Sequence, residues 1–185
     1  MNVNSGKFRG LKLESCKNPD LRPTKDRIKK SIFDVLRFKI KDKVFADLFG
    51  GTGQIGIEAY SQGARKVIIS EQDFNNSKII ERNLSKVKPE HNIKLINSCV
   101  LELFNNNPNE LEEVDIFFLD PPYEQLELLN KTLNLIMNLS KKPEIIIIET
   151  LRKNCDKILF NTTEELYLQK MYNYGTISVN LYEKI

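Results

Sequence analysis

The chain has 185 residues, of which 41% are hydrophobic and 29% charged, and its net charge is +3. This profile predicts one soluble globular domain with a small appendage. The longest apolar run, Ile145 to Ile148, is too short to cross a bilayer, and the N-terminus lacks the apolar core of a signal peptide. Three widely spaced cysteines, Cys16, Cys99 and Cys155, argue against a disulfide scaffold or a metal site and favour a reducing, cytoplasmic compartment.

Basic residues are concentrated in the first quarter of the chain. Residues 1–43 contain 13 Lys or Arg against 5 Asp or Glu, a net charge of +8. Residues 44–185 contain 15 against 20, a net charge of −5. A positive segment on an acidic body favours a polyanionic partner, although a solvated basic surface explains the charge equally well.

The first 43 residues are expected to form a separate unit, made of a small basic hairpin over 7–13 and a helix. Thr24 is a suitable N-cap for a helix running from about Lys25 to Arg37. Five apolar residues would give this helix one buried face: Ile28, Ile32, Phe33, Val35 and Leu36. We therefore place a domain boundary between residues 43 and 44.

From Val44 onward, short apolar runs alternate with amphipathic stretches. The pattern predicts strands over 44–49, 66–71, 92–97, 115–120 and 144–149, with helices over 54–62, 75–87, a short segment through Phe104, and 126–139. Such alternation implies right-handed crossovers and a parallel sheet covered on both faces. Residues 105–107 are expected to be a loop, and segments 167–172 and 176–182 an antiparallel hairpin that completes the sheet.

A glycine-rich loop follows the first predicted strand. Gly51, Gly53 and Gly56 have the spacing of a nucleotide-binding turn, and Glu71 lies 20 residues after Gly51, where a carboxylate can accept both ribose hydroxyls. This signal fits a dinucleotide, S-adenosylmethionine, or a turn without a ligand. Asp47 at the end of the strand would repel a pyrophosphate but attract an ammonium or sulfonium group, so it favours S-adenosylmethionine.

The tetrapeptide Asp120-Pro121-Pro122-Tyr123 follows the apolar fourth strand. Two prolines make a rigid turn, because each fixes φ and lacks an N–H group. The Asp120 carboxylate and a backbone carbonyl can then act as free acceptors, and Tyr123 offers a flat face to a planar ring. A proline-rich turn without function is the alternative.

Methylation of a base's amino group needs this set of groups. Two acceptors on the two N–H bonds favour a pyramidal nitrogen, whose lone pair can then attack a methyl carbon. Asp120 can also help to remove the proton that becomes acidic as the nitrogen gains positive charge. Neither a metal nor a covalent intermediate is required.

The sequence resembles the RsmD family of bacterial small-subunit ribosomal RNA guanine-N2 methyltransferases along nearly its whole length. The similar segments are 5–13, the segment 21–27 with Ile32, Phe33 and Leu36, the loop 47–53 with 56–59, and 120–123. The resemblance implies an α/β, Rossmann-like class I methyltransferase fold. Its sheet would be mostly parallel and seven-stranded, with a C-terminal antiparallel hairpin and a small basic N-terminal extension.

The resemblance also implies the reaction, its cofactor and its partner. S-adenosylmethionine would donate a methyl group to the 2-amino group of a guanine in 16S ribosomal RNA, within an assembling small subunit, and the chain would act as a monomer without a membrane partner. The cofactor-binding residues would be Asp47, Phe49, Gly51, Gly53, Glu71, Ser98, Cys99 and Asp120. The catalytic residues would be Asp120, Pro121, Pro122 and Tyr123, and the RNA-binding residues Arg9, Arg22, Thr24, Lys25 and Arg27.

Cys99 departs from the family pattern, which has Asp or Asn there to accept from the adenine amino group. Cysteine is a poor acceptor, so either Ser98 takes that role or cofactor affinity is reduced. We interpret Cys99 preferentially as a small core residue.

Three other functions remain open. They are amino-methylation of another base such as adenine in RNA or DNA, non-catalytic RNA binding during ribosome assembly, and a nicotinamide-dependent dehydrogenase. The tetrapeptide has no role in the dehydrogenase. Intact Asp47, Glu71 and Asp120 argue against a decayed enzyme.

Overall fold

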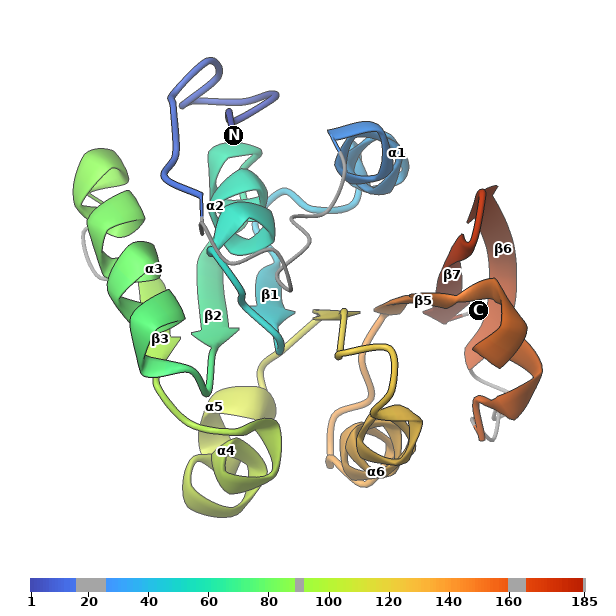
Figure 1. Cartoon of the computed structure of the whole chain (residues 1–185). Coiled ribbons are helices and arrows are strands. Elements are labelled where there is room, and N and C mark those ends of the chain that lie inside the picture. The colour runs from blue at the N-terminus through green and yellow to red at the C-terminus, as the bar shows by residue number, and fades with distance from the viewer. Residues whose placement is uncertain (16–25, 89–91, 160–165, 185) are drawn as a thin grey trace.

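The computed structural model describes residues 1–15, 26–88, 92–159 and 166–184, and it contains one central sheet flanked by helices (Figure 1). The helical elements are α1 (Asp26–Leu36), α2 (Gln54–Ser61), α3 (Phe74–Val87), α4 (Val100–Asn106), α5 (Pro108–Leu111), α6 (Leu126–Met137) and the 3-10 helix η1 (Arg152–Lys157). The strands are β1 (Val44–Asp47), β2 (Lys66–Ser70), β3 (Ile93–Ile96), β4 (Ile116–Leu119), β5 (Ile145–Leu151), β6 (Leu166–Tyr174) and β7 (Ile177–Lys184).

The seven-stranded sheet has the order β3-β2-β1-β4-β5-β7-β6. The first five strands in this order are parallel, whereas β7 pairs antiparallel with both β5 and β6. The expected mostly parallel sheet with a C-terminal antiparallel pair is confirmed. From β1 the chain adds β2 and β3 on one side and then crosses to add β4 and β5 on the other side, so the topological switch point lies between β1 and β4. In open α/β sheets, ligands bind at the carboxyl ends of the strands beside such a switch point.

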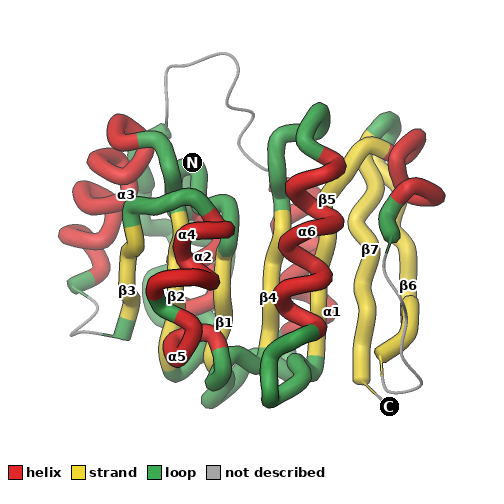
Figure 2. The backbone as a smooth tube through the Cα atoms, turned by 90° about the horizontal axis from the view of Figure 1, so that it is seen from below, coloured by secondary structure: helices red, strands yellow, loops and turns green. Residues whose placement is uncertain are grey.

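Helices cover both faces of the sheet (Figure 2). Alternate strand residues supply two separate apolar clusters, since successive side chains of a strand point to opposite faces. Phe45, Ile69 and Phe118 pack against α1, α2 and α3 on one face. On the other face Ala46 and Phe117 pack against α4, α5 and α6. The near-continuous apolar runs of the sequence therefore reflect strands that are buried on both sides.

The N-terminal segment and α1 share the first of these clusters. Val3 and Leu13 are buried in it together with the apolar face of α1. The N-terminal hairpin spans residues 1–13 and is therefore longer than the hairpin expected over 7–13. Residues 1–3 pair with residues 11–13 through backbone hydrogen bonds such as Val3 N to Leu11 O, so the turn itself occupies residues 5–10.

The expectation of a loop at residues 105–107 is wrong in part, because α4 runs through Asn106 and a short α5 follows directly. Val100, Leu103 and Phe104 are buried against the sheet, and this packing outweighs the weak helix propensity of asparagine. Thr24, the expected N-cap of the first helix, lies outside the described residues. No helix in the described part of the chain has both the length and the apolarity to span a membrane.

Gly56 allows α2 to pack closely on the sheet. A Cβ atom built there would lie 2.7 Å from Ile69 Cδ1 and 3.2 Å from Val67 Cγ1. We expect Gly56→Ala to lower the free energy of unfolding by about 1–3 kcal/mol, because the extra methyl group overpacks a rigid contact. Urea denaturation measures this change. Ser85→Ala on the exposed side of α3 is the control, and an equal effect of both substitutions would contradict the packing argument.

Candidate active site

A cavity of about 920 Å³ opens at the carboxyl ends of the parallel strands. Its lining brings together all four residues of the tetrapeptide and most of the expected cofactor residues: Asp47, Phe49, Gly51, Glu71, Ser98, Cys99, Asp120, Pro121, Pro122 and Tyr123. The glycine loop and the tetrapeptide turn thus face one space, as a methyl transfer between them requires. The volume lies in the usual range for cofactor sites.

The glycine loop is held by the next strand. Gly51 and Gly53 have φ angles of 55° and 75°, in the left-handed region that glycine adopts without steric cost. The Gly51 N–H donates to Glu71 Oε2 at 2.6 Å, and the Asp73 N–H donates to Glu71 Oε1 at 2.7 Å. Gly53 is the N-cap of α2 and does not line the cavity; it turns the chain into the helix.

Asp47 is a buried carboxyl at the end of β1, with 1% of its surface exposed. Its Oδ2 accepts the Gly56 N–H at 3.2 Å, whereas its Oδ1 has no hydrogen-bond partner. Burial, with a smaller contribution from the nearby Glu71 carboxylate, raises the pKa of Asp47 to about 7, although hydrogen bonds from Gly56 and Phe49 act to lower it. A cation in the cavity would reverse this shift.

Asp120 and Glu149 form a second acidic group. Leu119 pairs with Ile148 across β4 and β5, so the two carboxyls follow at the next register position. Burial, then the charges of Glu149 and Asp47, raise the pKa of Asp120 well above its ordinary value. Burial also raises the pKa of Glu149 to about 7, although its Oε1 accepts a 3.4 Å hydrogen bond from the Tyr123 hydroxyl. Its second oxygen, Oε2, has no partner.

Sequence reasoning missed Glu149 and Gln54. Glu149 ends an isoleucine run in the way that Asp120 ends its own strand, and this parallel was the signal available. Gln54, the first residue of α2, lines the cavity and is buried, but neither oxygen nor nitrogen of its amide has a partner. An unpaired buried amide costs about 1–3 kcal/mol, so it indicates a site that a ligand completes.

The third strand presents Ser98 and Cys99 to the same cavity. Ser98 Oγ is buried without a partner, while its backbone carbonyl accepts a hydrogen bond from Ser70. The preference for Cys99 as a core residue is wrong. Cys99 is partly exposed on the cavity wall and is the N-cap of α4, where its N–H donates to Glu102 at 3.3 Å. Capping therefore explains its position better than core packing does.

Arg9 and Arg27, the two expected RNA-binding residues that the structure describes, do not line this cavity. Arg9 and Arg27 are exposed, and the Arg27 guanidinium lies 5.7 Å from the centre of the Tyr174 ring. Arg22, Thr24 and Lys25 fall outside the described residues, so their contribution stays a prediction.

Burial of Asp47 should make the fold less stable as pH rises. The pKa of Asp47 is about 7 in the folded state and near its ordinary value of 3.8 when unfolded, so the folded state holds the extra proton between these values. Unfolding free energy therefore falls as pH rises through this window. We expect Asp47→Asn to raise the melting temperature at about pH 8 and to have little effect at about pH 4. Thermal melts across this range test it, and a pH-independent difference would contradict the buried-charge argument.

Comparisons with known proteins place the chain in a family. Residues 1–183 match the family model described as Conserved hypothetical protein 95. Ribosomal RNA small subunit methyltransferase D of Haemophilus influenzae is 33% identical over 182 residues, covering 97% of this chain and 91% of that protein. The protein of the same name from Buchnera aphidicola is 33% identical over 171 residues, covering 91% and 86%.

Solved structures lead to the same family. The structure of yhhF from Escherichia coli superposes with a TM-score of 0.82 at 26% identity, covering 100% of this chain and 97% of that one. A methylase from Haemophilus influenzae gives a TM-score of 0.76 at 27% identity, with 100% and 98% covered. The fold is that of the class I methyltransferases, and the chain belongs to the Conserved hypothetical protein 95 family, the family of the RsmD methyltransferases.

Proposed function

We propose that this protein transfers a methyl group from S-adenosylmethionine to the 2-amino group of a guanine in 16S ribosomal RNA. One observation carries the proposal: the glycine loop and the Asp-Pro-Pro-Tyr turn line a single cavity. Two relatives that share most of their length with this chain are named small-subunit ribosomal RNA methyltransferases, which supports ribosomal RNA as the substrate.

The chain's residues fit the proposed cofactor. The unpartnered Oδ1 of Asp47 is a strong acceptor for an ammonium group, and Glu71, tied down by Gly51 and Asp73, can accept ribose hydroxyls. Ser98 Oγ is a free hydrogen-bonding group on the opposite wall, next to Cys99. When bound, S-adenosylmethionine supplies an electrophilic methyl group on a sulfonium centre.

Asp120 is the proposed catalytic residue. As a carboxylate it accepts one N–H of the base, and a carbonyl of the rigid Pro121-Pro122 turn accepts the other, which localises the lone pair on nitrogen. Positive charge then develops on this nitrogen, and the carboxylate stabilises it. Tyr123 holds the ring by stacking, and its backbone carbonyl accepts a 3.2 Å hydrogen bond from Asn154, which fixes the turn.

Glu149 would not contact the reacting atoms but would control the protonation state of Asp120. It lies beside Asp120 in the sheet, contacts the Tyr123 hydroxyl and has a raised pKa. Asp120 and Glu149 repel one another as anions, so they favour a state in which the pair holds one proton. Positive charge on the bound cofactor or on the reacting nitrogen lets both carboxyls ionise. One of the two carboxylates can then accept the proton that the amino nitrogen loses.

We propose that the N-terminal unit, residues 1–43, binds RNA phosphates through Arg9, Arg22, Thr24, Lys25 and Arg27. The positive charge of this segment supports the assignment. The partner would be 16S ribosomal RNA in an assembling small subunit of the cytoplasm, and the chain would act as a monomer.

Mass spectrometry of ribosomal nucleosides tests both the reaction and its catalytic residue. Cells lacking the gene should lose one N2-methylguanosine from small-subunit RNA, and the wild-type gene should restore it. Asp120→Ala should not restore it, because losing the carboxylate slows transfer by about 10²-fold or more. Loss of an N6-methyladenosine instead would favour the alternative base.

Cofactor binding by the purified variant is the control. Asp120→Ala should still bind S-adenosylhomocysteine, measured as a thermal shift, because Asp47 and Glu71 supply most of the polar contacts. Full restoration of the methylated nucleoside by Asp120→Ala would remove Asp120 from the mechanism. A chain that binds RNA but no cofactor would be a non-catalytic assembly factor.

A further inference from the structure

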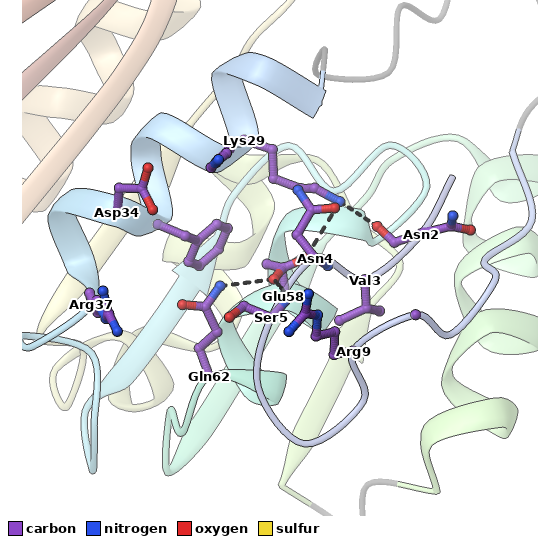
Figure 3. Close-up of a pocket in the computed structure, with 13 residues that line it drawn as sticks. Asn2, Val3, Asn4, Ser5, Arg9, Lys29, Asp34, Arg37, Glu58 and Gln62 are labelled. Atoms are coloured by element: carbon purple, nitrogen blue, oxygen red, sulfur yellow. Dashed lines mark hydrogen bonds and ion pairs between the residues drawn. The ribbon is translucent and has the colours of Figure 1, made fainter.

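A second cavity, of about 570 Å³, lies between the N-terminal segment and α1 (Figure 3). Its walls come from residues 2–5 and 9–10, from α1 and Arg37 directly after it, and from Glu58 of α2 and the C-cap residue Gln62. It shares no lining residue with the proposed active site. Of its lining residues, the proposed function uses only Arg9, and it gives the cavity itself no role.

The floor of the second cavity is a fully buried ion pair. Lys29 Nζ lies 3.4 Å from Glu58 Oε2, and both side chains have no exposed surface. Lys29 also donates to the Asn2 carbonyl at 2.6 Å, and Glu58 accepts the backbone N–H groups of Asn4 and Ser5 at 2.7 and 2.9 Å (Figure 3). These partners leave the pair electrically neutral and satisfied, so it fixes the cavity walls rather than requiring a ligand.

The rim of the cavity carries three exposed cations, Arg9, Lys30 and Arg37. Figure 3 shows that Arg9 comes from the N-terminal loop, and Arg37 comes from the turn directly after α1. None of the three forms an ion pair within the described part of the chain. Asp34 is the only other carboxylate in the lining besides Glu58, so four cations face two anions and the lining has a net charge of +2.

We propose that this second cavity binds a backbone phosphate of the RNA substrate, at a nucleotide other than the one methylated. Two guanidinium groups and an ammonium group around one cavity supply the positive charge that a phosphodiester attracts, and arginine binds phosphate through paired N–H donors. The cavity has the size of a small-ligand site, so it can admit the phosphate with part of its sugar. The inference rests on the proposed function only in taking RNA as the substrate.

Neutralising the rim tests this proposal. The triple variant Arg9→Gln, Lys30→Gln, Arg37→Gln should weaken binding of a fluorescein-labelled 16S ribosomal RNA hairpin by about tenfold and lower the slope of log affinity against log salt by about 1. Fluorescence anisotropy at several salt concentrations measures both quantities. Thermal melts should be close to those of the wild type, because the three side chains are exposed.

A matched control separates this cavity from general attraction. Lys7, Lys12 and Lys41 are exposed cations of the same N-terminal region that do not line the cavity, and their replacement by glutamine removes the same charge. The control triple should weaken RNA binding by less than about threefold. Equal losses in both triples, or no loss in the rim triple, would overturn the proposal.

Two further measurements keep the outcomes distinct. If inorganic phosphate raises the melting temperature of the wild type but not of the rim triple, while RNA affinity is unchanged, the cavity binds free phosphate and the RNA proposal is wrong. Binding of S-adenosylmethionine should be equal in all three proteins. Its absence from the wild type would contradict the proposed function and would leave the RNA comparison interpretable.

Discussion

Buried carboxyl groups without a cation are the constraint on which this site depends. Asp47 ends β1, Asp120 directly follows β4 and Glu149 lies in β5, and burial raises the pKa of each carboxyl on these three adjacent strands. Apolar clusters fill both faces of the strands, so the buried carboxyls of Asp47 and Glu149 cannot move to water without disrupting the core. Such an arrangement lowers the folding stability of the free protein. It also favours binding of a cation that fits the cavity, because the bound positive charge removes the repulsion between the carboxylates.

The remaining parts of the fold hold these acids in place. Left-handed glycines turn the chain after β1, and the Glu71 carboxylate fixes that turn from β2. Prolines make the turn after β4 rigid, and Asn154 of η1 donates to it. At the other end of α2, Glu58 and Ser61 bind the backbone of the N-terminal segment. One helix therefore borders the proposed methyl-transfer site at its start and supports the proposed phosphate site near its end.

Local patterns predicted the sheet and the tetrapeptide that lines the cavity, because each depends on residues that are contiguous in the sequence. The local sequence alone is enough to recognise the glycine spacing, the acids Asp47 and Glu71 at strand ends, and the tetrapeptide. It is not enough for Glu149, because only pairing of β4 with β5 brings it beside Asp120. The second cavity likewise needs Arg9, Lys30 and Glu58 together, and no periodicity links positions so far apart. The small size and usual burial of cysteine favour a core position for Cys99, but its N–H instead donates to Glu102 at the start of α4.

The affinity for S-adenosylmethionine as a function of pH tests the central claim most directly. With the pKa of Asp47 at about 7, a cation must displace a proton at low pH, so the dissociation constant should fall about tenfold between pH 6 and pH 8. Isothermal titration calorimetry should also detect proton release. Asp47→Asn should bind weakly with a nearly flat pH profile. A wild-type affinity that does not change with pH, or a variant that retains the full profile, would contradict the account.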